Sequence, residues 1–201
     1  TDIQNVLPIV LSYYCINGKE MRWLRNLKTQ DIDEENKVVT VREDDKVVAV
    51  IPIDDRLISF CRASEEYCLL DDTYIKTDLI LKPTKNSVGD IVAENTMYVR
   101  IYQAFDEANV KRLKLNNLAK SRKIALLLDI RKERYLTNGD FQTICELFNP
   151  NASVGAYDNL TKYYTNATND KVLRKKATLN ELIDVNVNEH IREILDNLGW
   201  D

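Results

Sequence analysis

Two runs of β-branched residues lie close together in a chain whose other apolar residues recur at helical spacing, and these runs constrain the fold most. Residues 37–42 (Lys-Val-Val-Thr-Val-Arg) and 46–53 (Lys-Val-Val-Ala-Val-Ile-Pro-Ile) are separated only by the acidic triplet 43–45. Such residues favour extended backbone, and a short polar segment between two such runs indicates a β-hairpin. Pro52 has no backbone N–H and marks a strand end or an edge. The sequence therefore predicts one small antiparallel sheet.

Helical periodicity describes most of the remaining chain, because apolar residues recur three and four positions apart. Asp2 is placed to cap the first helix, and Asn17-Gly18 to end it. Residues 67–82 are ambiguous, with short strands possible at 68–70 and 79–81. The predicted helices cover residues 3–14, 19–26, 54–63, 95–108, 115–129, 141–148, 159–166 and 181–200, with loops at 83–93 and 149–158. The expected fold class is mainly α with a small antiparallel β-sheet.

The length of 201 residues allows one substantial hydrophobic core. We expect one domain over residues 1–176 and a C-terminal helical tail over residues 177–201, through which the chain could self-associate. Because the first residue is Thr1 and not methionine, we also expect the natural N-terminus, and a further N-terminal domain, to lie upstream.

Composition excludes several classes of protein. The longest apolar run, residues 6–16, contains Pro8 and Ser12 and is shorter than the roughly 20 residues that a membrane-spanning helix needs. The four cysteines include no CxxC pair, so they predict neither a zinc site nor a disulfide framework. We expect reduced, buried cysteines in a cytoplasmic protein that has no metal, cofactor or membrane partner.

Charge is distributed unevenly along the chain. The net charge is -4, and residues 1–110 carry 13 basic against 20 acidic groups, a net of -7. Residues 111–134 carry nine basic against two acidic groups, a net of +7, and residues 171–176 add four further basic groups. A basic patch on an acidic protein favours one binding face for double-stranded DNA. The candidate DNA contacts are Lys111, Arg112, Lys114, Lys120, Arg122, Lys123 and Lys175, with Arg22 and Lys46 from earlier in the chain.

These basic residues also have plainer interpretations. Arg122 with Lys120 and Lys123 could form a phosphate clamp or a solvated helix face. Lys46 could be an exposed lysine at a strand end, and Arg22 could belong to a solvated face. The sequence alone leaves these alternatives open.

Five segments occur in an order that carries further information. They are Gly18 to Leu27 followed by Asp31-Ile-Asp33, the hairpin, the box Ala119-Lys-Ser-Arg122, Asn138-Gly139 to Asn149, and Thr161-Lys-Tyr-Tyr164. In this order they resemble the catalytic domain of tyrosine recombinases, the phage integrases, over nearly the whole chain. The resemblance implies a tyrosine that attacks a DNA phosphodiester. It also implies that the phosphodiester is surrounded by two arginines, a lysine and two histidine-type groups. It places Tyr164 at the nucleophile position.

Several positions of the recombinase pattern hold other residues. The acidic Glu20 stands at the first arginine position, and Ala119 and Asn149 stand at the two histidine positions. Arg122 keeps the second arginine position, and Lys46 is the candidate for the lysine. Loss of one stabilising donor can cost about 3–4 kcal/mol of transition-state stabilisation, so several losses together should abolish turnover. We therefore expect no catalytic residues, with Arg122 and Tyr164 as vestiges.

Three functions from different classes follow from the resemblance. The main hypothesis is a DNA-binding protein without recombination activity, a phage transcriptional repressor that maintains lysogeny on DNA in the bacterial host cell. The second is an active but diverged site-specific recombinase that forms a 3′-phosphotyrosyl DNA intermediate through Tyr164. The third is a protein-interaction module that keeps only the scaffold. Tyr164 could accordingly be a phosphate hydrogen-bond donor, a nucleophile or a packed aromatic residue.

Overall fold

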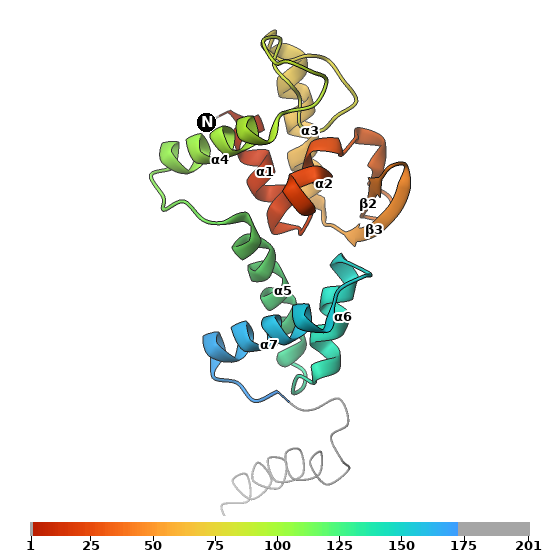
Figure 1. The fold of residues 1–201 in the computed structure, drawn as a ribbon, viewed down its shortest axis with the longest axis vertical. Helices are drawn as coiled ribbons and strands as arrows, with labels where there is room; N and C mark the ends of the chain where they lie inside the picture. Colours follow the sequence, from red (N-terminus) through yellow and green to blue (C-terminus); the bar gives the residue numbers. More distant parts are fainter. Residues whose placement is uncertain (1, 173–201) are drawn as a thin grey trace, which may run out of the picture.

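Helix α5 (Leu115–Arg131) runs between two groups of elements in the computed structural model, which describes residues 2–172 (Figure 1). The larger group contains helices α1 to α4 and the sheet, and the smaller group contains α6 and α7. The other helices and turns are α1 (Ile3–Tyr13), η1 (Lys19–Met21), α2 (Arg22–Asn26), η2 (Thr29–Asp31), α3 (Asp55–Leu70), α4 (Glu94–Glu107), α6 (Asn138–Phe148) and α7 (Val154–Thr168). The strands are β1 (Ile32–Asp33), β2 (Val38–Glu43) and β3 (Lys46–Pro52). The predicted fold class is confirmed.

The predicted hairpin forms strands β2 and β3 of the sheet. The strands are antiparallel in the order β1-β2-β3, and β1 is a two-residue strand that the sequence did not predict. Glu43 pairs with Lys46, which leaves Asp44 and Asp45 as a two-residue turn with φ of 48° and 60°. Positive φ at both positions matches the turn type that suits the twist of a hairpin, and aspartate tolerates this conformation.

Several predicted boundaries are wrong. Helix α3 continues to Leu70, so the short strand predicted at 68–70 does not form. The reason is that Ser64 and Cys68 stay on the same buried face as Cys61, at spacings of three, four and seven residues. Helix α7 begins at Val154, five residues before the predicted start, and shortens the predicted loop at 149–158. Residues 79–81 contribute an isolated bridge from Leu79 to Lys28 in place of a strand.

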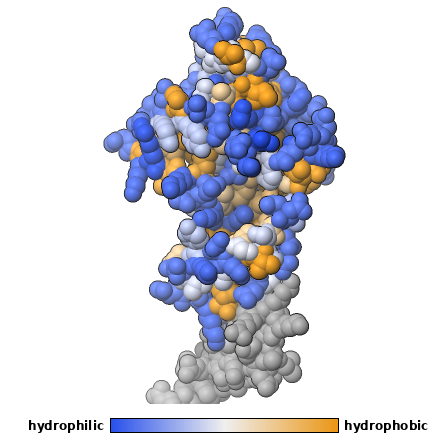
Figure 2. All heavy atoms as spheres, in the orientation of Figure 1, coloured by the Kyte–Doolittle hydropathy of each residue, from blue (hydrophilic) through white to orange (hydrophobic). Residues whose placement is uncertain are grey.

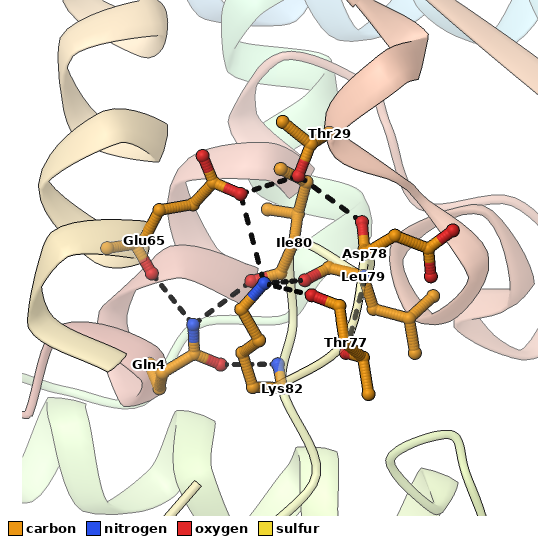
Figure 3. Close-up of polar contacts among 9 residues, drawn as sticks. Gln4, Thr29, Glu65, Thr77, Asp78, Leu79, Ile80 and Lys82 are labelled. Carbon is orange, nitrogen blue, oxygen red and sulfur yellow. Dashed lines mark hydrogen bonds and ion pairs between the residues drawn. The ribbon is translucent and has the colours of Figure 1, made fainter. Parts of the chain in front are cut away.

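A buried glutamine ties the long segment between α3 and α4 to helix α1 (Figure 3). The side-chain nitrogen of Gln4 donates to Ser64 Oγ at 2.7 Å and to the carbonyl of Ile80 at 3.0 Å. Its side-chain oxygen accepts the backbone N–H of Lys82 at 2.8 Å. Gln4 therefore satisfies backbone groups that would otherwise be buried without a partner.

The side chain of Lys82 is buried within the same segment. Its ammonium donates to the carbonyl oxygens of Thr77 at 2.8 Å and Leu79 at 2.7 Å, and it lies 3.8 Å from the Glu65 carboxylate (Figure 3). Arg100, also buried, donates to the carbonyl of Lys82 at 2.9 Å. These bonds fix a segment that has little secondary structure of its own, because hydrogen bonds from charged donors are stronger than neutral ones.

We predict that Lys82→Met lowers the free energy of unfolding by about 2–4 kcal/mol, because two buried carbonyls lose a charged donor. Urea denaturation followed by circular dichroism measures this change. The matched control is Lys85→Met, since the Lys85 side chain is exposed and its ammonium lies 3.7 Å from the Asp72 carboxylate. This substitution should change the free energy of unfolding by no more than about 0.5 kcal/mol. Equal losses in the two variants would contradict the structural role of Lys82.

Candidate nucleic-acid interface

A cavity of about 580 Å³, here called the central cleft, opens where η1, the hairpin, α5 and the end of α6 meet. Four of the five segments that the recombinase resemblance singled out contribute lining residues, and the segment Thr161 to Tyr164 contributes none. The lining residues include Gly18, Lys19, Trp23, Glu43, Asn116, Ala119, Lys120, Lys123, Asn149 and Asn151. The fold thus brings these separate sequence segments to one place.

The central cleft is positively charged although the chain as a whole is acidic. Three ammonium groups, on Lys19, Lys120 and Lys123, line it against the single carboxylate of Glu43. Asparagine side chains add neutral hydrogen-bond donors. On the face drawn in Figure 2, hydrophobic residues form separate patches among hydrophilic ones. A concave site with excess lysine and amide groups suits a phosphate anion.

Gly18 allows the Trp23 ring to pack against the backbone at the wall of the central cleft. Its backbone has φ 65° and ψ -178°, and a Cβ atom there would lie 2.5 Å from Cδ1 of Trp23. The indole nitrogen of Trp23 in turn donates to Glu43 Oε1 at 2.6 Å. This contact joins α2 to the end of β2, so Gly18 and Trp23 together hold Glu43 at the cleft wall.

Helix α5 presents Asn116, Ala119, Lys120 and Lys123 to the central cleft, at spacings of three and four residues. Arg122 is not among the lining residues. Its guanidinium carbon lies 5.0 Å from the ring centroid of Tyr14 and 5.7 Å from that of Tyr13. Helical spacing explains this difference, because Arg122 lies on a neighbouring face of α5. The structure therefore brings the two candidate lysines of this box to the cleft but not Arg122.

Arg122 lies beside the rings of Tyr13 and Tyr14, and its Nε is buried without a hydrogen-bond partner among the described residues. The hydroxyl of Tyr14 donates to the carboxylate of Asp54, the residue that caps α3. Burial, and then this hydrogen bond, raises the pKa of Tyr14 to about 12, so the hydroxyl stays protonated. Hydrogen bonds from the Tyr14 hydroxyl and the Leu57 backbone N–H, and then the positive charge of Arg122, lower the pKa of Asp54. Arg122 thereby links α5 to α1 and to the start of α3.

Tyr164 is fully buried in α7. Its ring packs edge-on against Phe141 with 5.5 Å between centroids, and its hydroxyl donates to Asp170 Oδ2 at 2.7 Å. The same carboxylate accepts a hydrogen bond from Arg131 at 2.7 Å. Burial, and then the contact with Asp170, raises the pKa of Tyr164 to about 12. Of the three possible roles, this conformation matches the packed aromatic residue.

The neighbouring Tyr163 was missed by sequence reasoning. It is 50% exposed, and the centroid of its ring lies 3.8 Å from the ammonium of Lys120. The signal available in the sequence was the double tyrosine of the box, because consecutive helical residues point in directions about 100° apart. One of the two had to face away from the core.

Other candidate residues lie outside the central cleft lining. Lys46 is exposed at the first position of β3, and Lys111 is exposed before α5. The carboxylate of Glu20 is half-exposed and pairs with Lys19 at 4.0 Å and Arg22 at 3.6 Å. Glu20 is not among the residues that line the central cleft, although it directly follows the lining residue Lys19 in η1.

A second cavity of about 630 Å³ adjoins the central cleft and shares Gly18, Lys19 and Asn116 with it. Arg112 and Lys114 line this second cavity. Arg112 is paired with the carboxylate of Asp106 and lies 4.5 Å from the ring centroid of Tyr102. Lys175 and the tail at 177–201 lie outside the described residues.

No helix in the described part of the chain is both long enough and apolar enough to cross a membrane. Within residues 2–172, no group of three His, Cys, Asp or Glu side chains is placed to hold a metal ion. The four cysteines are buried and free.

The class of protein follows from this architecture. The fold is that of a tyrosine-recombinase catalytic domain, as in the crystal structure of XerA recombinase, with a TM-score of 0.54 at 17% sequence identity. The match covers 84% of this chain and 62% of the XerA chain, so the chain spans less than two thirds of that protein's length. Residues 1–177 match the family described as MrpR, C-terminal catalytic domain, and the chain belongs to this family. No curated protein sequence matches the chain.

We predict that Gly18→Ala destabilises the protein by about 1–3 kcal/mol. The new methyl group would have to displace the Trp23 ring, and the backbone conformation at this position favours glycine. Thermal unfolding measures this change. Gly155→Ala is the control, because Gly155 lies in α7 and its added Cβ would meet only Ser153 Oγ at 3.8 Å. That control should be neutral or slightly stabilising. A Gly18→Ala variant as stable as the control would contradict the packing described.

Proposed function

We propose that this chain binds double-stranded DNA through the phosphate backbone at its central cleft and does not cut it. In this proposal it is the DNA-holding part of a phage transcriptional repressor that maintains lysogeny. The observation that carries the proposal is the convergence of Lys19, Lys120 and Lys123 on one concave site with a single carboxylate. A protein of this kind acts on DNA in the cytoplasm of the bacterial host.

Binding of the DNA backbone needs only positive charge and a surface of complementary shape. Each lysine that neutralises a DNA phosphate releases condensed counterions, which supplies a favourable free energy at low salt. The acidic remainder of the chain, with a net of -7 over residues 1–110, opposes contact elsewhere. DNA is therefore directed to the basic segment of α5 and to the neighbouring cleft.

Catalysis needs more than this cleft offers. The two positions that the resemblance assigns to histidines hold Ala119 on α5 and Asn149 just after α6, and neither side chain is a general acid or base at neutral pH. The cations that line the cleft are the lysines Lys19, Lys120 and Lys123, so no guanidinium among the lining residues is placed to stabilise the charge that develops on a phosphate under attack. The guanidinium of Arg122 lies against Tyr14, which supports the proposal that the active site is degenerate.

We infer the regulatory role from DNA binding without DNA cleavage. A recombinase-like domain that holds DNA without breaking it can still block a promoter. We therefore assign repression of transcription as its output. Within the same proposal, residues 1–176 act as one domain, and the tail at 177–201 mediates self-association.

An active but diverged recombinase is the second candidate, and the word "catalytic" in the family description favours it. This function requires the hydroxyl of Tyr164 to leave Asp170 and reach a phosphodiester. It would then displace the 5′-oxygen of the next nucleotide and form a 3′-phosphotyrosyl bond. The two candidates share DNA binding and differ in this covalent step.

We predict that the 201-residue chain binds a short duplex of mixed sequence with an affinity that falls steeply as salt rises. Lys123→Gln should weaken binding similarly for all sequences and reduce the slope of log K against log salt by about 1. Fluorescence anisotropy across a salt series measures both quantities. The control Lys85→Gln changes an exposed lysine outside the cleft lining and should leave the slope within error. Absent binding, or binding insensitive to salt, would contradict the proposed function.

A further inference from the structure

A third cavity, of about 390 Å³, continues the central cleft between α5, α6 and α7. Lys120 and Lys123 line both spaces, so the two cavities share their cationic wall. Cys145 and Leu160 give the third cavity an apolar floor, and Tyr163 stands on the side opposite the lysines' helix. The cavity thus combines two ammonium groups with one exposed phenol.

Tyr163 has the surroundings of a ligand-binding group. The ammonium of Lys120 lies 3.8 Å from the centroid of its ring, and half of the residue remains exposed. A hydrogen bond and the charge from Lys120, together with the charge of Lys114, lower the pKa of the Tyr163 hydroxyl. A more acidic phenol is a better hydrogen-bond donor to an anion. In contrast, the hydroxyl of Tyr164 already donates to Asp170 inside the core.

We propose that the third cavity is a phosphate subsite, in which the hydroxyl of Tyr163 and the ammonium of Lys120 together bind one backbone phosphate of double-stranded DNA. Tyr163, and not Tyr164, is then the tyrosine that touches DNA. The inference rests on the proposed function, because the phosphate belongs to the duplex held in the central cleft. Lys123 lines both cavities, so two phosphates of the same duplex can be bound side by side.

The subsite binds but does not react. Phosphate binding by a phenol and an ammonium requires no bond to break, and the hydroxyl proton stays on Tyr163 or is shared with the phosphate oxygen. A phosphate at this position also replaces the Lys120–Tyr163 contact with a three-way contact among the lysine, the phenol and the anion.

The test compares two matched variants of the 201-residue chain, Tyr163→Phe and Tyr67→Phe, with the unaltered protein. Each removes one hydroxyl from an exposed tyrosine, and Tyr67, at 38% exposed, lies on α3 outside both cavities. The probe is a short fluorescein-labelled duplex of mixed sequence, read by anisotropy at fixed low salt. Tyr163→Phe should weaken binding about tenfold, the effect of losing a hydrogen bond to a charged partner, with an unchanged melting temperature. Tyr67→Phe should bind as the unaltered protein does.

The outcomes separate this inference from the proposed function. If the unaltered chain binds DNA and Tyr163→Phe binds equally well, the subsite is overturned while the central cleft stands. A loss of affinity confined to Tyr164→Phe, at an unchanged melting temperature, would also overturn it, because Tyr164 would then be the tyrosine that contacts DNA. If the unaltered chain binds no duplex, the proposed function fails and the subsite fails with it.

Discussion

The packing of helix α5 sets its rotation about its own axis, and the candidate interface depends on that rotation, in which Leu127 is fully buried and Arg122 lies against the rings of Tyr13 and Tyr14. With Arg122 turned towards α1, the residues that face the central cleft are those on the neighbouring face of the helix, including Lys120 and Lys123. A turn of about 100° would exchange these roles. Arg122 therefore contacts residues of α1, whereas Lys120 and Lys123 line the cleft in which the proposed function places the DNA backbone.

This division matters for chemistry because the two kinds of cation act differently on phosphate. Lysine is a flexible point charge that attracts an anion from many directions, whereas arginine offers a rigid, planar pair of donors. Catalysis of phosphoryl transfer needs donors fixed where charge develops in the transition state. Three lysines opposed by Glu43, which Trp23 holds at the wall, suit holding a duplex better than stabilising a reacting phosphate.

Much of the fold could be predicted from the sequence, and the reasons are local. The hairpin was identifiable because β-branched residues and the Asp44-Asp45 turn agree with each other. The continuation of α3 to Leu70 was not, because Ser64 on its buried face gives a weak hydropathy signal and the short apolar run at 68–70 is equally typical of a strand. The site was only partly predictable. A motif aligned by residue type cannot tell which of two adjacent tyrosines is buried, because that choice depends on Phe141 and Asp170, which belong to other segments of the chain.

The central claim is that the cleft holds DNA without cutting it, and the most direct measurement is a search for a covalent intermediate. The 201-residue chain is incubated with a nicked suicide duplex, at a protein concentration where anisotropy shows the duplex to be bound, and then denatured and separated on a gel. The account predicts bound duplex before denaturation and no protein–DNA adduct after it. An adduct that disappears in Tyr164→Phe would contradict the account and establish an active recombinase.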